Sequence, residues 1–452
     1  MKGEFDGGHI TSDGGVVLLR EVEERRRIIK RLAQCFADYR DDRYCEHSVE
    51  ELLRQRIYGI ALGYEDLNDH DELRVDQLLA AAVGKEEPTG AGRRRERDKG
   101  KALAGKSTLN RMELRSEKPE QDGRYKKIAA DETAIERLFV EIFLESVGEE
   151  PDQIVLDLDS TDDLIHGKQE GRFFHAYYGG YCYLPLYIFC EDYLLCARLR
   201  EANHGDTAGV VDELTRIVGQ IRERWRNVRI VLRGDSAFGM DSIMTWCEQN
   251  KVDYIFGKAK NSRLEAEIKE EQELARQEYE KTGLAARVYK DFRYRTLDSW
   301  SRDRRVVAKA EQLAKGSNPR FIVTSLTKDE IEARELYEKQ YCARGEMENR
   351  IKEQQLYLFA DRTSTRMMKS NQLRLWFSSI AYVLMNELRR LGLNNTELED
   401  AQCERIRLKL FKIGALIRVT VRRVLVSFSS AYPYERVFEQ VYLNLTRLPL
   451  RC

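Results

Sequence analysis

The sequence has few prolines and no long apolar run. Seven prolines in 452 residues argue against long disordered linkers. No apolar stretch approaches the roughly 18 residues that a membrane-spanning helix requires, so we expect no membrane partner. Residues 1–15 contain no apolar segment of the kind that marks a secretory signal.

Paired cysteines are missing as well. The nine cysteines are odd in number and include no CxxC spacing. This pattern disfavours both a disulfide framework and a four-cysteine zinc site. It favours a reducing compartment, and we therefore expect a cytoplasmic protein.

An excess of charge of either sign is also absent. Lysine and arginine number 76, aspartate and glutamate number 77, and the net charge is −1. A uniformly basic surface is therefore excluded, so binding of a polyanion would have to depend on local patches. Two basic runs are candidates for such patches: Arg93, Arg94, Arg95 and Arg97 in the first, and Arg302, Arg304 and Arg305 in the second.

The first part of the chain, residues 1–150, has helical periodicity. Apolar residues recur at helical spacing from Val16 to Phe36. Ser48 followed by Glu51 predicts a capping box at the start of the next helix. Residues 84–106 are rich in glycine and basic residues, which predicts an exposed loop. A boundary is expected near Pro151.

The pattern then changes to short apolar strands separated by helices, which predicts an α/β domain with a mixed sheet. The expected order is strand 154–159, strand 181–190, strand 193–200, helix 207–225, strand 228–235, helix 240–249 and strand 252–256. Residues 258–319 interrupt this order with a charged helix and two strand-like runs, and we interpret them as a β-rich insertion.

The remainder of the chain returns to long apolar and helical runs. A strand is expected from Arg320 to Leu326, a long helix from Lys328 to Leu358, and an apolar helix from Asn371 to Leu391. Residues 405–428 alternate basic and apolar side chains, which predicts a basic hairpin with its turn at Gly414. The predicted domains are 1–150, 151–257, 258–319, 320–365 and 366–452.

Acidic residues end two of the predicted strands. Asp157 and Asp159 leave the same face of one strand, and Asp235 ends another. Glu348 lies on the predicted long helix, where Arg344 is four residues earlier. Each acid alone has an ordinary structural explanation, as a cap, a turn or a surface ion pair.

Taken together, the carboxylates indicate a chemistry. Mg²⁺ prefers carboxylate oxygens and keeps several waters, and Mn²⁺ is similar. Two such ions about 4 Å apart can catalyse an in-line phosphoryl displacement. We predict that Asp159, Asp235 and Glu348 hold two ions, with Asp157 as the alternative first ligand.

The spacing of these acids resembles that of the DDE insertion-sequence transposases with a ribonuclease H-like core. Tyr341, Arg344 and Glu348 match the Tyr-x2-Arg-x3-Glu signature of one branch. Further runs resemble the insertion-sequence family numbered thirteen-eighty: ITSDGG, GYEDLNDHDELR, DLIHGKQEG, YYGGYCYLPL, RGDSAFG and LKLFKIGA. The resemblance covers nearly the whole chain.

The resemblance implies further roles for single residues. Tyr341 and Arg344 would contact the DNA backbone beside the cut. The signature lysine is replaced by Gln355, and Lys352, one turn after Glu348, would take a similar phosphate contact. Trp300 in the insertion would stack on a flipped base, although a place in the insertion's core explains it equally well.

The function implied is a bacterial, nucleoid-associated enzyme that cuts double-stranded DNA at inverted-repeat ends and joins them to target DNA. The N-terminal helical domain would read the end sequence, and pairing of two ends implies a homodimer on DNA. Two alternatives stay open: a ribonuclease H-like nuclease without strand transfer, and a non-catalytic DNA-binding descendant.

Overall fold

The computed structural model describes residues 3–114, 121, 126–203 and 207–450, and the chain divides into two compact units. The first unit comprises Met1–Ile142, Ile165–Glu170 and Lys352–Cys452, and the second comprises Phe143–Leu164 and Gly171–Ile351. None of the helices in the described ranges combines the length and apolar character needed to cross a bilayer. The N-terminal region therefore shares a unit with the C-terminal region, whereas the proposed division into five domains stays a prediction.

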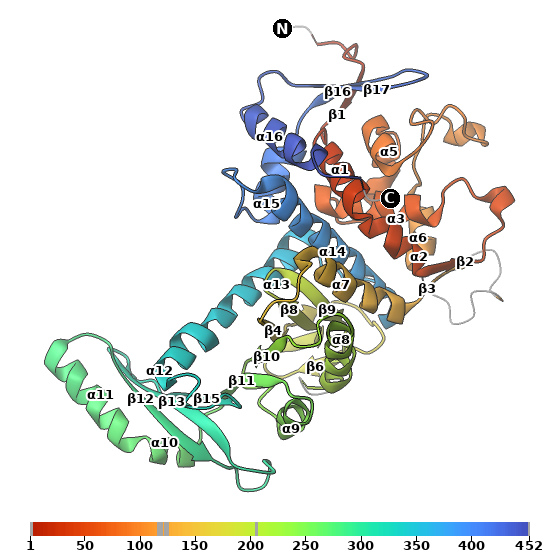
Figure 1. The fold of residues 1–452 in the computed structure, drawn as a ribbon. Coiled ribbons are helices and arrows are strands. Elements are labelled where there is room, and N and C mark those ends of the chain that lie inside the picture. Colours follow the sequence, from red (N-terminus) through yellow and green to blue (C-terminus); the bar gives the residue numbers. More distant parts are fainter. Residues whose placement is uncertain (1–2, 115–120, 122–125, 204–206, 451–452) are drawn as a thin grey trace. The chain divides into compact units, whose positions relative to one another are not determined.

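The first unit is mainly helical (Figure 1). Its α-helices are α1 (Val16–Arg26), α2 (Ile28–Gln34), α3 (Val49–Leu62), α4 (His70–Leu73), α5 (Gln77–Val83), α6 (Lys106–Glu113), most of α7 (Glu132–Val147), α14 (Met368–Leu388), α15 (Cys403–Ile406) and α16 (Glu435–Thr446). Short 3-10 or π-helical turns are Asp42–Tyr44, Leu67–Asp69, Glu96–Asp98, Arg389–Leu393 and Arg407–Phe411. The apolar helix α14 packs on α3 and α1. Because α14 is buried along most of its length, its apolar character is explained by the core of this unit.

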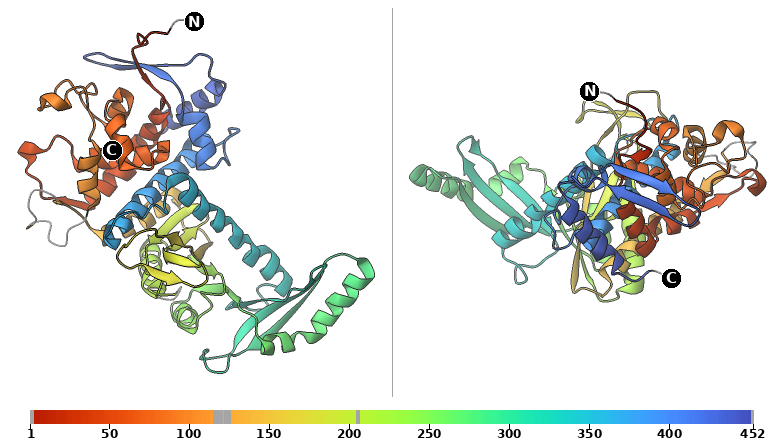
Figure 2. Two further views of the ribbon diagram at one scale, coloured as in Figure 1. Left: turned by 180° about the vertical axis from the view of Figure 1, so that it is seen from behind. Right: turned by 90° about the horizontal axis from the view of Figure 1, so that it is seen from above.

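Two small sheets complete the first unit. One is β1 (His9–Thr11), β16 (Ala415–Val419) and β17 (Val424–Phe428), which lie side by side in Figures 1 and 2. The other is β2 (Phe36–Asp38) with β3 (Ile128–Ala130). The first of these sheets joins segments from opposite ends of the chain.

Two of the motifs quoted above meet beside that sheet. The Gly15 N–H donates to the Phe411 carbonyl oxygen at 3.1 Å, and a Cβ at Gly15 would come within 1.8 Å of the Leu410 carbonyl oxygen. Lys412 forms an ion pair with Asp13 at 2.6 Å. Only glycine permits this backbone approach, which accounts for the ITSDGG run opposite LKLFKIGA.

The second unit is built on a nine-stranded mixed sheet. Its strands are β4 (Gln153–Ser160), β8 (Leu186–Cys190), β9 (Tyr193–Arg198), β10 (Arg229–Gly234), β11 (Asp253–Lys258), β12 (Ala286–Tyr294), β13 (Arg304–Leu313), β14 (Gly316–Ser317) and β15 (Arg320–Thr324). The order is β12-β13-β15-β11-β10-β4-β8-β9, with β14 on β13. The central strands β4, β10 and β11 run parallel, and the other pairs are antiparallel.

Helices flank this sheet, and a small second sheet follows β4. The helices are α8 (Val210–Arg224), α9 (Asp241–Gln249), α10 (Ser262–Glu267), α11 (Lys269–Thr282), α12 (Ala333–Glu335), a π-helical segment (Leu336–Tyr341), a 3-10 turn (Cys342–Arg344) and α13 (Gly345–Leu358), whose end lies in the first unit. The small sheet has the order β5 (Asp163–Leu164), β7 (Gly180–Tyr183), β6 (Phe173–His175).

The segment that carries the predicted Tyr-Arg-Glu residues is attached to the large sheet by an apolar cluster. Leu336 and Tyr337 pack against side chains from β10, β11, β13 and β15, among them Val231 and Ile255. The following turns lead directly into α13. Burial of this cluster therefore fixes the helical segment over the central strands.

The proposed insertion does not form a sheet of its own. Its strands β12 and β13 extend the large sheet, because β13 pairs with β15 and β15 pairs with β11. Helix α11 lies along β12 and β13 (Figures 1 and 2). The expected helix and strands of residues 258–319 are thus present, but their sheet is continuous with the central strands.

Other predicted elements also differ from the structure. The helix expected from Val16 to Phe36 breaks at Arg27, whose φ is 52°, and the buried Glu23 carboxylate accepts the N–H groups of Ile29 and Lys30. Burial raises the pKa of Glu23 to about 7. The capping box of Ser48 and Glu51 is confirmed.

The hairpin predicted in residues 405–428, with its turn at Gly414, lies later in the chain. Residues Cys403–Phe411 are helical, and the strands begin only at Ala415, with the turn near Thr420. The alternation fitted a helix as well as a strand, because Ile406 and Leu410 are four apart and both are buried. Helix α16, after the hairpin, was not predicted.

Candidate active site

Asp159 and Asp235 come from the carboxyl ends of two adjacent parallel strands. Strands β4 and β10 pair in register up to Leu158 opposite Gly234. The next residues, Asp159 near the end of β4 and Asp235 directly after β10, therefore lie side by side at this edge of the sheet, and the charge of Asp235 acts on Asp159. The structure brings together the two aspartates that the sequence predicted.

Each aspartate is held by a local hydrogen bond. The Ser160 N–H donates to Oδ1 of Asp159 at 2.9 Å, and the Ala237 N–H donates to Oδ1 of Asp235 at 2.8 Å. One oxygen of each carboxylate is left for other partners. The turn after each strand thus orients its acid.

Arg344 connects the third acid to the first. Its Nη2 lies 3.0 Å from Oε1 of Glu348, and its Nη1 lies 3.7 Å from Oδ2 of Asp159. Glu348 is in the first turn of α13, directly after the π-helical and 3-10 turns. Irregular helical turns of this kind occur often at functional sites. Here they bring the Glu348 side chain toward the edge of the sheet.

The acids influence one another electrostatically. Burial raises the pKa of Asp159 to about 6; Arg344 opposes the rise, and the charges of Asp235 and Glu348 add to it. Arg344 pairs with Asp159 and Glu348, and the charge of Asp235 also acts on it. Two negative charges remain without a compensating cation in this group.

Asp157 has a different partner. Arg233, directly opposite it on β10, donates to both of its carboxylate oxygens, at 2.5 and 2.7 Å. Arg233 also donates to the Gln340 carbonyl oxygen at 2.6 Å. The buried Asp157–Arg233 pair therefore connects β4 and β10 with the helical segment that precedes Arg344.

Gly257 permits the close approach of Tyr341. A Cβ at Gly257 would lie 2.8 Å from the Tyr341 hydroxyl oxygen, 2.7 Å from the Ser236 nitrogen and 3.0 Å from the Asp235 carbonyl carbon. A larger residue there would displace the turn that carries Asp235. Burial raises the pKa of Tyr341, so its hydroxyl stays protonated beside these acids.

The residue types fit divalent cations, although no set of ligands is preassembled. Among the described residues, no group of three His, Cys, Asp or Glu side chains is close enough together to hold a metal ion as it stands. Arg344 lies between two of the acids and supplies the positive charge there. Carboxylate oxygens with uncompensated charge are the donors that Mg²⁺ and Mn²⁺ bind.

The sequence family agrees with this geometry. Residues 1–450 match the family described as "Transposase DDE domain group 1". The chain belongs to the DDE transposase family. It is therefore identified as a transposase, an enzyme of the DDE class.

Among solved structures, a piggyBac transposase synaptic complex with hairpin DNA is similar to this transposase. The similarity covers 87% of this chain and 79% of that chain, with a TM-score of 0.41 and 11% sequence identity. Among curated proteins, none matches the chain.

Trp300 of the transposase is a buried residue. It is 3% exposed, its ring meets Tyr294 edge-on at 5.8 Å, and Lys258 and Arg304 lie over it at 5.0 and 5.6 Å. A base could stack on this ring only after these neighbours moved apart. The structure thus places Trp300 in the core, as the alternative interpretation of the sequence had it.

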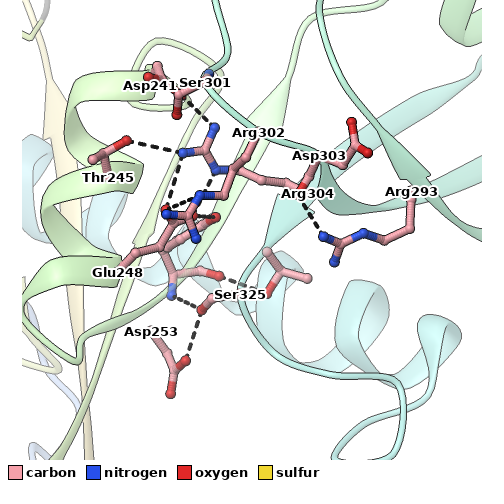
Figure 3. A network of polar contacts seen from close by, with 12 residues as sticks. Asp241, Thr245, Glu248, Asp253, Arg293, Ser301, Arg302, Asp303, Arg304 and Ser325 are labelled. Atoms are coloured by element: carbon pink, nitrogen blue, oxygen red, sulfur yellow. Dashed lines mark hydrogen bonds and ion pairs between the residues drawn. The ribbon is translucent and has the colours of Figure 1, made fainter.

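The second basic run is also structural. Arg304 is 2% exposed and pairs with Asp241 and Glu248, and Arg302 pairs with Glu248 as well (Figure 3). Arg305 pairs with Asp291. The prediction that this run contacts phosphates is wrong for Arg304 and Arg305, because both arginines are buried and already pair with partly buried acids.

The other predicted contacts are less constrained. Lys352 is an exposed residue of α13 and falls in the first unit. Arg93 of the first basic run pairs with Glu46 at 3.2 Å. A phosphate contact by Lys352 stays a prediction.

Sequence reasoning missed Arg233 and Gly257 of the transposase. Arg233 precedes Asp235 by two residues in LRGDS, and Asp157 precedes Asp159 by two in LDLD. The repeated spacing was a signal, because residues two apart share a strand face. Gly257 gave no such signal, since its neighbours come from distant parts of the chain.

Proposed function

We propose that this transposase cuts DNA at the inverted-repeat ends of an insertion sequence and joins the 3′ hydroxyl ends to target DNA. Asp159, Asp235 and Glu348 would hold two Mg²⁺ or Mn²⁺ ions. The observation that carries the proposal is the position of both aspartates at one sheet edge, with Arg344 pairing Asp159 to Glu348. When bound, the ions supply charge stabilisation and activation of the attacking oxygen.

The protein's own residues prepare this site. Asp157 and Arg233 hold β4 and β10 at the register that places the two aspartates side by side. Ser160 and Ala237 orient the aspartates through their N–H groups. If divalent cations bound the carboxylates in place of Arg344, its guanidinium would be free to bind a DNA phosphate. Arginine is well suited to phosphate contacts.

The assignment to the Tyr-Arg-Glu branch and to a ribonuclease H-like core belongs to the same proposal. Tyr341, Arg344 and Glu348 support the branch through their common segment beside β10 and β11. The order β9-β8-β4-β10-β11, with three parallel central strands, supports the core. A homodimer on paired DNA ends would complete the active assembly.

The proposal is tested by incubating the protein with labelled DNA carrying the element's end, with Mg²⁺ or with EDTA. Wild type is compared with Glu348→Gln. Metal-dependent nicking at the end, products joined to a second DNA, and loss of both in the variant are expected. Nicking without joining would indicate a nuclease, and binding without cleavage by wild type would indicate a non-catalytic descendant.

A further inference from the structure

A short segment directly after the first acid differs in composition from the rest of the chain. Residues 171–183 contain six aromatic side chains, one arginine and no acid, in a chain that is 9% aromatic and 34% charged. The aromatic residues are Phe173, Phe174, Tyr177, Tyr178, Tyr181 and Tyr183. Absence of acids over this length favours a polyanionic partner.

Four of these rings are exposed. Phe173 is 38% exposed, Phe174 59%, Tyr177 85% and Tyr181 48%. Exposed aromatic rings that lie together, as Phe174 and Tyr181 do, are uncommon on a surface that binds nothing. Tyr178 and Tyr183 have the opposite role, because Tyr183 is buried and Tyr178 packs on a core cluster that includes Cys182 and Leu184.

Two of the exposed rings, Phe174 and Tyr181, lie together with the arginine on one face of the small sheet. Phe174 is paired with Tyr181 across β6 and β7, and their rings meet edge-on at 5.7 Å. Arg172, two residues before Phe174, lies over the Tyr181 ring at 4.7 Å. We call Arg172, Phe174 and Tyr181 the aromatic platform.

The platform continues the strand pair that carries Asp159. Ser160 pairs with Leu186 where β4 meets β8, and three residues later Asp163 pairs with Tyr183 where β5 meets β7. Four residues span at most about 14 Å, and each neighbouring strand adds about 5 Å. Tyr181 is two residues beyond Tyr183 on β7, so the platform lies at most about 26 Å from Asp159, which is about eight base-pair steps of about 3.4 Å each.

We propose that the aromatic platform binds unpaired DNA bases beside the cut, by stacking them on Tyr181 and Phe174. Bases stack on aromatic rings irrespective of sequence, and an arginine plane adds a cationic contact. The inference rests on the proposed function, because it places the platform next to the acids that would cut DNA. The alternative occupant, a second copy of this chain, is an outcome of the test.

The test measures binding of the full-length protein, in EDTA, to a labelled oligothymidine strand of about 20 nucleotides and to a duplex of the same length. Phe174→Ala with Tyr181→Ala is expected to weaken single-strand binding about tenfold or more, with little effect on the duplex. The salt dependence is expected to stay unchanged, because the rings carry no charge. Phe174→Tyr with Tyr181→Phe keeps the rings and is expected to bind like wild type.

The matched control is Tyr442→Ala, which removes a tyrosine of similar exposure, 41%, from α16. An equal loss in this control, or unchanged single-strand binding in the double variant, would overturn the proposal. Sedimentation provides the second readout: loss of a dimer in the double variant with unchanged DNA affinity would assign the surface to a second copy. Because binding is measured without metal, failure here is separable from failure of cleavage.

Discussion

The guanidinium of Arg233 donates two hydrogen bonds to the carboxylate of Asp157, two residues before the two aspartates of the candidate active site. Both residues are buried. The third contact of Arg233, to the Gln340 carbonyl oxygen, reaches the segment that carries Tyr341 and Arg344. This pair therefore links the positions of all three predicted metal ligands.

Removing one partner of this pair is expected to destabilise the protein. Arg233→Ala leaves the Asp157 carboxylate buried without its counter-charge, and we expect the free energy of unfolding to fall by about 3–5 kcal/mol. Asp157→Asn with Arg233→Gln is expected to cost less than the sum of the two single changes. Urea denaturation of wild type, Asp157→Asn, Arg233→Gln and the double variant measures this coupling. Strictly additive effects of the two single changes would contradict it.

Gly257 is expected to be essential for activity more than for stability. Gly257→Ala places a Cβ against the Ser236 nitrogen and the Tyr341 hydroxyl, so the neighbouring turn must shift at a cost of about 1–3 kcal/mol. Cleavage is expected to fall by about tenfold or more, because small displacements of reacting groups are costly.

The control for Gly257 is Gly219→Ala in α8, where a new Cβ meets nothing within 4 Å. Alanine there is expected to leave cleavage unchanged and to stabilise the helix by up to about 1 kcal/mol. Thermal unfolding and a cleavage time course measure both variants. Wild-type activity in Gly257→Ala would show that the close approach is not needed.

Arg344 is expected to compete with divalent cations. Its guanidinium pairs with Asp159 and Glu348, so Arg344→Gln removes a positive charge from the place where cations would bind. We expect Mn²⁺ to bind about tenfold more tightly in the absence of DNA, and DNA to bind more weakly. Calorimetric titration tests this, with Arg334→Gln, from an exposed pair with Glu338, as the control. Unchanged Mn²⁺ affinity would contradict the prediction.

The raised pKa of Asp159 predicts a pH-dependent stability in EDTA. The folded protein binds this proton with a pKa of about 6, whereas the ordinary pKa of an aspartate is 3.8, so wild-type stability falls as the pH rises between these values. Asparagine at this position does not titrate. The stability of Asp159→Asn relative to wild type should therefore rise over this pH range by about 2 kcal/mol. Denaturation midpoints at pH 4 and pH 7 measure it. If the stability difference between Asp159→Asn and wild type is the same at both pH values, the pKa of Asp159 is not raised by its burial beside Asp235, Glu348 and Arg344.

The sequence was sufficient to predict the strands that carry Asp159 and Asp235, because buried parallel strands are short continuous apolar runs that end in turn residues. Few registers then remain in which these two apolar strands can pair in parallel. Glu348 could be selected only through the resemblance, since an Arg–Glu pair on a helix is common.

Other features could not be read from the sequence. The break at Arg27 depends on a buried glutamate that caps the next helix, which local periodicity does not reveal. Strand pairing is decided by tertiary packing, so β12 and β13 could not be assigned to the edge of the large sheet. Burial of Trp300 under Lys258 and Arg304 likewise depends on residues from three different segments.

The most direct test of the account is a change of metal preference at Asp235. A thiolate favours softer cations than a carboxylate does, and Mn²⁺ accepts it better than Mg²⁺. With Asp235→Cys, we predict that cleavage of end-bearing DNA is lost in Mg²⁺ and partly restored in Mn²⁺, whereas Asp235→Asn stays inactive in both. Cleavage by Asp235→Cys at the wild-type rate in Mg²⁺ would contradict the assignment of this carboxylate as a ligand of the catalytic ions.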